Sequence, residues 1–123
     1  MILVDTSVWI DHLRHGEVEL TRLLHAGQVL THRYVIGELA LGNIQNRNIV
    51  LNSLQSLPQV TSASDEEALH FIETNGLYGK GIGYIDAHLL AAVRLSPDAS
   101  LWTRDKSLLA ESIRLGLCVK LIH

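Results

Sequence analysis

Residues 1–11 read MILVDTSVWID, and the rest of the chain can be interpreted from this stretch. The apolar run at 2–4 predicts a short buried strand. DTSVWIDHLR at 5–14 predicts a helix directly after it, with Thr6 or Ser7 as the N-cap. Asp5 stands between the two, at the end of the strand. Because a buried strand end rarely keeps an unpaired carboxylate, Asp5 is the first candidate for a functional residue.

Short apolar strands and helices alternate along the remaining chain. Strands are expected at 2–4, 28–31, 59–62, 99–103 and 118–122, and further helices at 17–26, 32–42, 46–57, 65–75, 84–95 and 106–116. Ser64 and Glu67 have the spacing of a capping box for the helix at 65–75. This order predicts one three-layer α/β domain over residues 1–123, in which a mainly parallel five-stranded sheet is flanked by helices.

Three further acids accompany apolar segments. Glu38 lies in YVIGELALG at 34–42, Asp86 in GIGYIDAHLLAA at 81–92, and Asp105 in SLWTRD at 100–105. Parallel sheets bind ligands outside the carboxyl ends of their strands, where the strand order reverses. If the strands at 2–4 and 99–103 are neighbours there, all four acids can reach one crevice. Four carboxylates in one place are suited above all to holding a divalent metal ion.

Each acid also has a structural explanation. Asp5 and Asp105 are favourable N-caps, and Asp86 lies in a first helical turn, where the helix dipole stabilises negative charge. Glu38 could be a solvated helix residue. The functional interpretation therefore depends on the four acids occurring together.

Composition narrows the function further. The net charge is −3, so any contact with nucleic acid must rely on local cations or on metal ions. Cys118 is the single cysteine, which fits a reducing compartment, and no apolar run is long enough to span a bilayer. Asp5 interrupts the first apolar run, so we expect no signal peptide and a cytoplasmic protein without a membrane partner.

The remaining ionisable residues are expected to be peripheral. The histidines lack the spacing of a zinc site, and His88 should point to a different helix face from Asp86. Asp11 should be exposed on the first helix. A solvated helix face is expected from Asp65, Glu66, Glu67 and Glu73.

Four motifs in order resemble those of PIN-domain ribonucleases: MILVDTSVWID, VIGELALG, GIGYIDAHLLAA and LWTRDKSL. The resemblance spans essentially the whole chain, and its length and single-domain layout look most like the VapC toxins of type II toxin–antitoxin pairs. It implies a PIN-like fold and a Mg²⁺- or Mn²⁺-dependent endoribonuclease that leaves a 5′-phosphate and a 3′-hydroxyl.

The resemblance also implies roles for individual residues. Asp5, Glu38, Asp86 and Asp105 match its acidic cluster and are the expected catalytic residues and metal ligands. We expect Asp5 and Asp86 to be the principal ligands, Asp105 to bind directly or through water, and Glu38 to orient or deprotonate the attacking water. The supporting hydroxyls would be Thr6 or Ser7, and Thr103. RNA phosphates would meet Lys80, Arg104 and Lys106.

The same resemblance implies a homodimer and a cognate antitoxin, which together could form a larger toxin–antitoxin assembly. The helices at 17–26 and 46–57 carry more apolar residues than one thin sheet can cover, which favours such partners.

Three alternatives stay open from the sequence. A non-catalytic interaction module could keep this fold, and a PIN-domain RNA-processing nuclease could keep the chemistry without being a toxin. Phosphotransfer at a single aspartate is the third. It is disfavoured because DTS at 5–7 lacks a second acid and QVTS at 59–62 has none.

Overall fold

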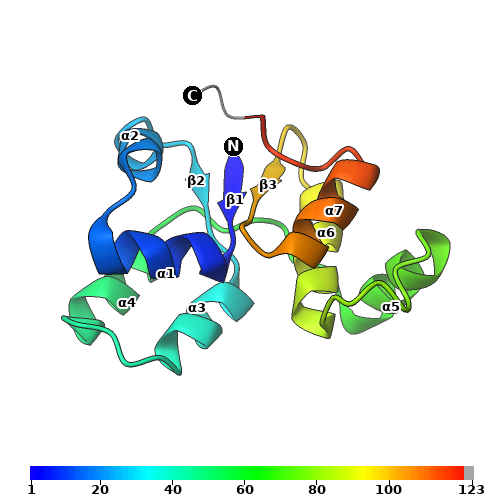
Figure 1. Ribbon diagram of the computed structural model, residues 1–123, viewed down its shortest axis with the longest axis horizontal. Coiled ribbons are helices and arrows are strands. Elements are labelled where there is room, and N and C mark those ends of the chain that lie inside the picture. Colours follow the sequence, from blue (N-terminus) through cyan, green and yellow to red (C-terminus); the bar gives the residue numbers. More distant parts are fainter. Residues whose placement is uncertain (121–123) are drawn as a thin grey trace.

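The computed structural model describes residues 1–120 of the 123-residue chain. Strands and helices alternate along these residues, beginning with β1 (Figure 1). In chain order the elements are β1 (Ile2–Val4), α1 (Thr6–His15), α2 (Val18–His25), β2 (Val29–Leu30), α3 (Arg33–Ala40), α4 (Arg47–Gln55), α5 (Asp65–Thr74), α6 (Tyr84–Leu95), β3 (Ser100–Trp102) and α7 (Lys106–Arg114). Every predicted helix is present, within a few residues of its predicted bounds.

The sheet is parallel, with strand order β2-β1-β3. The first strand of the chain is therefore central, and Ile2 is in register with Val29 on one side and Ser100 on the other. Leu3 and Leu101 are completely buried. The strands are apolar because helices cover the sheet, as is usual for parallel strands. The predicted strand order reversal lies between β1 and β3, which places the ends of these two strands side by side.

The prediction of five strands is wrong. Gln59 and Cys118 extend the sheet only as isolated parallel bridges, to Thr31 and Leu101. The predicted strand at 59–62 is cut short because Thr61 turns its amide to the Ser96 hydroxyl instead of continuing the ladder. At the other edge, residues 118–120 form only the bridge, and residues 121 and 122 of the predicted strand at 118–122 lie outside the described residues.

The helices divide into two groups on either side of the sheet in Figure 1. Helices α1 to α4 gather on the left with β2, and α5 to α7 gather on the right with β3. Between them runs one apolar core that includes Leu3, Val8, Leu39, Leu89 and Leu101. We refer to β1 through α4 as the N-terminal half and to α5 through α7 as the C-terminal half. The carboxyl ends of β1 and β3 lie where the two halves meet.

The starts of the helices decide where several polar side chains point. The predicted capping box is present, since the Ser64 hydroxyl accepts from the Glu67 amide and the Glu67 carboxylate accepts from the Ser64 amide. The predicted N-cap of α1 is wrong: Asp5 occupies that position, without a side-chain capping bond, and Thr6 is the first helical residue. The hydroxyls of Thr6 and Ser7 are thereby left for other partners. No helix among residues 1–120 is long and apolar enough to cross a membrane.

Candidate active site at the carboxyl ends of the strands

Asp5 is the buried centre of the site. Its side chain follows β1 and is only 5% exposed. The Oδ2 atom accepts hydrogen bonds from Ser7 Oγ at 2.7 Å and from Thr103 Oγ1 at 2.8 Å. Ser7 and Thr103 are themselves 3.4 Å apart. Two hydroxyls from opposite halves of the molecule thus fix one carboxylate, and both are among the predicted supporting residues.

Glu38 approaches from α3. Its Oε1 atom accepts from Thr6 Oγ1 at 2.7 Å, so the first residue of α1 holds the carboxylate of the neighbouring helix. Both predicted hydroxyls of the DTS motif are therefore used, one for Asp5 and one for Glu38. Unlike Asp5, Glu38 is an exposed residue.

Asp86 occupies the first turn of α6, where its Oδ2 atom accepts from the Gly83 amide at 3.1 Å. Burial raises the pKa of Asp86 above its usual value, and the charges of Asp5, Asp105 and Glu38 raise it further, while the Gly83 hydrogen bond acts in the opposite direction. The three other acids are thus close enough to act on Asp86 electrostatically. The structure therefore places the other three acids around Asp86, and the roles predicted for the four stay predictions.

Asp105 begins α7. Its Oδ1 atom accepts from the Leu108 amide at 2.9 Å, so the structural explanation of Asp105 as an N-cap holds. The cap uses one oxygen only. The Asp105 amide donates to Thr103 Oγ1 at 3.1 Å, and this hydroxyl is the one that donates to Asp5.

One property is common to the four acids. In each, one carboxylate oxygen is held by a hydroxyl or an amide, and the other accepts no hydrogen bond from residues 1–120. None of the four forms an ion pair with these residues. By contrast, carboxylates elsewhere do pair with an arginine: Asp11, Glu17, Glu19 and Glu111. The site therefore concentrates negative charge without a cation of its own.

The donor set suits a hard divalent cation. It consists of carboxylate and hydroxyl oxygens, and Mg²⁺ prefers oxygen ligands and retains several waters. Among residues 1–120, no three His, Cys, Asp or Glu side chains converge into a ready-made metal cage. Two of the four carboxylates are turned toward backbone amides, Asp86 toward Gly83 and Asp105 toward Leu108. Ligands that meet a cation partly through water fit such an arrangement.

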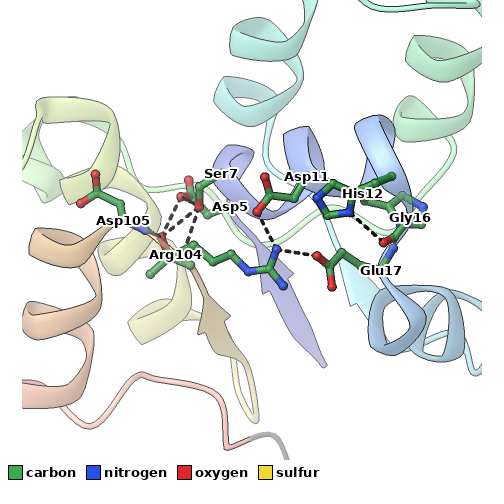
Figure 2. A network of polar contacts seen from close by, with 10 residues as sticks. Asp5, Ser7, Asp11, His12, Gly16, Glu17, Arg104 and Asp105 are labelled. Carbon is green, nitrogen blue, oxygen red and sulfur yellow. Dashed lines mark hydrogen bonds and ion pairs between the residues drawn. The ribbon is translucent and has the colours of Figure 1, made fainter.

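Arg104 joins the site to the outer surface of α1. Its amide donates to Ser7 Oγ at 3.0 Å, and its Nη1 atom lies 2.6 Å from both Asp11 Oδ2 and Glu17 Oε1 (Figure 2). These two carboxylates raise the pKa of the guanidinium further above its usual range. Figure 2 shows the side chain extending away from Asp105 toward Glu17. The two other predicted RNA contacts, Lys80 and Lys106, are exposed.

The profile of the PIN domain matches residues 2–111, a range that contains all four acids. The chain belongs to the PIN-domain family. It is also similar to Ribonuclease VapC32 from two strains of Mycobacterium tuberculosis, CDC 1551 / Oshkosh and ATCC 25618 / H37Rv. Each is 44% identical over 119 residues, which cover 97% of this chain and 96% of the relative. The resemblance to PIN domains and to VapC proteins is thus confirmed.

Sequence reasoning missed two groups around this PIN-domain site. Asp11, expected to be exposed, is partly buried against Arg104, and Glu17, which belongs to none of the four motifs, pairs with the same guanidinium. Asp65 is solvated as expected, but it also holds Tyr84 and the buried His88. A signal for the second group existed, because Tyr84 and His88 are one helical turn apart. The first group had none, since its members are distant in sequence.

Proposed function

We propose that this PIN domain is a metal-dependent endoribonuclease that acts as the toxin of a type II toxin–antitoxin pair. The observation that carries the proposal is the set of four carboxylates, each with one held and one available oxygen and none with a cationic partner among residues 1–120. Similarity to Ribonuclease VapC32 along nearly the whole chain supports RNA as the substrate.

Each acid has a role that follows from its surroundings. Asp5 and Asp86, the more buried pair, would hold a divalent cation, with Asp105 binding it directly or through water. A bound Mg²⁺ or Mn²⁺ would neutralise the acids, lower the pKa of a water and stabilise the leaving oxygen. Glu38 is exposed, and within residues 1–120 Thr6 is its one hydrogen-bond partner, so its other carboxylate oxygen can orient the attacking water and accept its proton.

The RNA strand needs cations beside this acidic centre. Lys80 and Lys106 are exposed and form no ion pair with residues 1–120, so both can contact phosphates. Arg104 can do so only by leaving Asp11 and Glu17. We therefore expect Lys80 and Lys106 to contribute more to RNA binding than Arg104 does.

Exposed apolar side chains support protein partners. Leu41 is 90% exposed and Ile49 is 68% exposed, both in the N-terminal half. A groove of about 400 Å³ nearby is lined by Ile10, Leu13, Ile44 and other residues of the α1 and α3–α4 region. We propose that an antitoxin segment occupies this groove, that the antitoxin brings a cation to Asp5 and Asp86, and that the chain forms a homodimer in the cytoplasm.

RNA cleavage with and without divalent metal tests the nuclease. Purified protein should cut RNA in Mg²⁺ or Mn²⁺ and stop in EDTA, and Asp5→Asn and Asp86→Asn should each abolish cleavage. Neither change alters side-chain volume. In EDTA, the melting temperature of each variant should therefore be about equal to that of the parent or higher. Full activity in either folded variant would refute the assignment of the metal ligands.

Growth experiments test the toxin separately. Expression of the parent should arrest growth, the Asp86→Asn variant should not, and co-expression of a neighbouring small gene should restore growth. A chain that cleaves RNA but never arrests growth would be an RNA-processing nuclease instead.

A further inference from the structure

The turn between β3 and α7 meets the acidic site with each of its three residues. The Thr103 hydroxyl donates to Asp5 at 2.8 Å. The Arg104 amide donates to Ser7 at 3.0 Å, and Asp105 is itself one of the four acids. Arg104 belongs to neither β3 nor α7, so its backbone is held by contacts outside these elements. Its side chain points away from Asp105 and is available to anchor the turn (Figure 2).

Arg104 contacts α1 at two points. Its amide donates to Ser7, and its Nη1 atom lies 2.6 Å from Asp11 Oδ2. Ser7 and Asp11 are four residues apart, so they are neighbours on one face of α1. The same Nη1 atom lies 2.6 Å from Oε1 of Glu17, the residue that precedes α2. The three contacts fix Arg104 along α1 as well as against it.

The surroundings of the guanidinium are also ordered. The Glu17 amide donates to His12 Nδ1 at 3.0 Å, which fixes the backbone of one acceptor. The guanidinium carbon lies 5.8 Å from the centre of the Trp102 ring, at the end of β3. Both acids belong to the N-terminal half and Arg104 to the C-terminal half. This ion-pair network therefore joins the two halves beside the acidic site.

The Arg104 amide decides how the Ser7 hydroxyl is used. A serine hydroxyl has one proton to donate. Because the amide donates to Ser7 Oγ, the serine is an acceptor there, and its own proton is directed to Asp5 Oδ2 at 2.7 Å. Without the amide, the hydroxyl could rotate toward Thr103 Oγ1, which lies 3.4 Å away. The position of the turn thus bears on the orientation of Asp5.

We propose that Arg104 is a positioning residue of this active site. Its guanidinium, bound to Asp11 and Glu17, holds the turn after β3 against α1. The Arg104 amide then directs the Ser7 hydroxyl to Asp5. This inference rests on the proposed nuclease function, in which Asp5 is a metal ligand, and it gives Arg104 a role other than contact with phosphate.

The Arg104→Met variant tests the role by the sign of its effect. By charge alone, removing a cation near the acids would strengthen Mn²⁺ binding, and losing a phosphate contact would raise the KM for RNA. Loss of positioning should instead raise the Mn²⁺ concentration for half-maximal cleavage about three- to tenfold, less than is typical of a lost direct partner. The KM for an RNA oligonucleotide should stay within about twofold of the parent.

A second arginine provides the matched control. Arg114 pairs with Glu111 at the other end of α7 from Asp105, and its side chain is 42% exposed, against 37% for Arg104. Partly exposed ion pairs contribute little to stability, so both Arg→Met variants should melt within about 4 °C of the parent. Arg114→Met should leave the Mn²⁺ concentration for half-maximal cleavage unchanged.

Removing an acceptor separates positioning from phosphate binding. Asp11→Asn would free a phosphate-binding Arg104, and the KM for RNA would then fall. A positioning Arg104 would lose an anchor, so the Mn²⁺ concentration should rise in Asp11→Asn and in Glu17→Gln. Adding Asp11→Asn to Arg104→Met should have little further effect, because both changes break the same contact. The acid variants keep the test decisive if Arg104→Met does not fold.

Hydrogen exchange measures the same contact without metal or RNA. The Arg104 amide should exchange with solvent severalfold faster in Asp11→Asn than in the parent, because its bond to Ser7 opens more often. Arg104→Lys keeps a cation for the acids, and its amide and Mn²⁺ requirement should lie between those of the parent and Arg104→Met.

The outcomes distinguish this inference from the function on which it rests. A Mn²⁺ requirement in Arg104→Met at or below that of the parent, a lower KM in Asp11→Asn, or unchanged exchange of the Arg104 amide would each overturn the positioning role. A parent protein that cuts no RNA in Mg²⁺ or Mn²⁺ would overturn the nuclease itself, and amide exchange would still decide whether the acids hold the turn.

Discussion

The N-terminal and C-terminal halves hold their acids in different ways. In the N-terminal half, hydroxyl side chains hold Asp5 and Glu38. In the C-terminal half, the backbone amides of Gly83 and Leu108 hold Asp86 and Asp105. Amide donors come with any helix start, whereas hydroxyl donors depend on particular residues. The N-terminal acids should therefore be the more sensitive to side-chain substitution.

The same difference extends to the helix starts. The helix that carries Glu38, α3, is capped by His32, a completely buried residue whose Nδ1 atom accepts from the Tyr34 amide. In the C-terminal half, Asp105 caps α7 with a carboxylate and Ser64 and Glu67 cap α5. The imidazole of His32 and the carboxylate of Glu67 lose their capping function at different pH values, so a change of pH can perturb the two halves separately.

Acidification should weaken the N-terminal half first. Burial, followed by the charges of Arg33 and His88, lowers the pKa of His32 to about 4 from 6.5. The unfolded chain takes up this proton at higher pH than the folded chain does. The contribution of neutral His32 to the free energy of unfolding is therefore fully present above about pH 6.5. It falls between pH 6.5 and 4, by up to about 3 kcal/mol.

Denaturant unfolding across this pH range measures the effect. His32→Asn keeps a capping acceptor and removes the titration, so it should lose less stability than the parent between pH 6.5 and 4. The cap at Glu67 is unaffected in most of this window, because the pKa of Glu67 is lowered below 4.5 by hydrogen bonds from Ser64. An identical pH slope in parent and variant would show that His32 does not control the N-terminal half.

Removing the hydroxyls around Asp5 should affect activity strongly. Thr103→Val keeps the shape of the side chain and deletes a donor to Asp5, and Ser7→Ala deletes the other donor. Loss of such outer partners commonly costs about 10- to 100-fold in metal affinity or activity. We expect a loss in this range for each variant. The Mn²⁺ concentration needed for half-maximal RNA cleavage is the measurement, and Thr6→Val provides the matched change at Glu38. If neither hydroxyl variant alters that concentration, the ordering of Asp5 does not depend on them.

Removing one amide in the C-terminal half should have a smaller effect. Gly83→Pro deletes the N–H that donates to Asp86, at a φ of −86° that proline nearly adopts. A net hydrogen bond contributes about 0.5–1.5 kcal/mol, so cleavage should fall roughly two- to tenfold. Gly83→Ala keeps the amide, and its Cβ would meet Asp86 Oδ2 at an ordinary 3.8 Å. Equal activities of the proline and alanine variants would show that the amide does not position Asp86.

The main features of the fold follow from patterns in the sequence. Alternating apolar runs and helices indicate a parallel sheet. Because ligands bind outside the carboxyl ends of parallel strands, the positions of Asp5 and Asp105 after two such strands predict that they lie close together. The strand count does not follow, because the residues at 59–62 and 118–120 have strand-like composition while their backbone bonds depend on partners elsewhere, such as Ser96.

Local rules also misjudge side chains that have distant partners. Serine is a residue type favoured at N-caps, but the Ser7 hydroxyl donates to Asp5 and accepts from the amide of Arg104, which is far along the chain. The pairing of Arg104 with Asp11 and Glu17 likewise depends on the tertiary structure. Capping of α7 by Asp105 was predictable because donor and acceptor are neighbours in sequence.

The parallel pairing of β1 with β3 also bears on how the protein folds. Ile2 pairs with Ser100, so the central strand closes a loop of about 100 residues, and non-local contacts of this kind form slowly. Each half carries only two of the acids. A chain with its helices formed but this pairing absent would hold no complete site. During refolding, RNA cleavage should therefore appear with the slowest cooperative phase rather than with the recovery of helical circular dichroism.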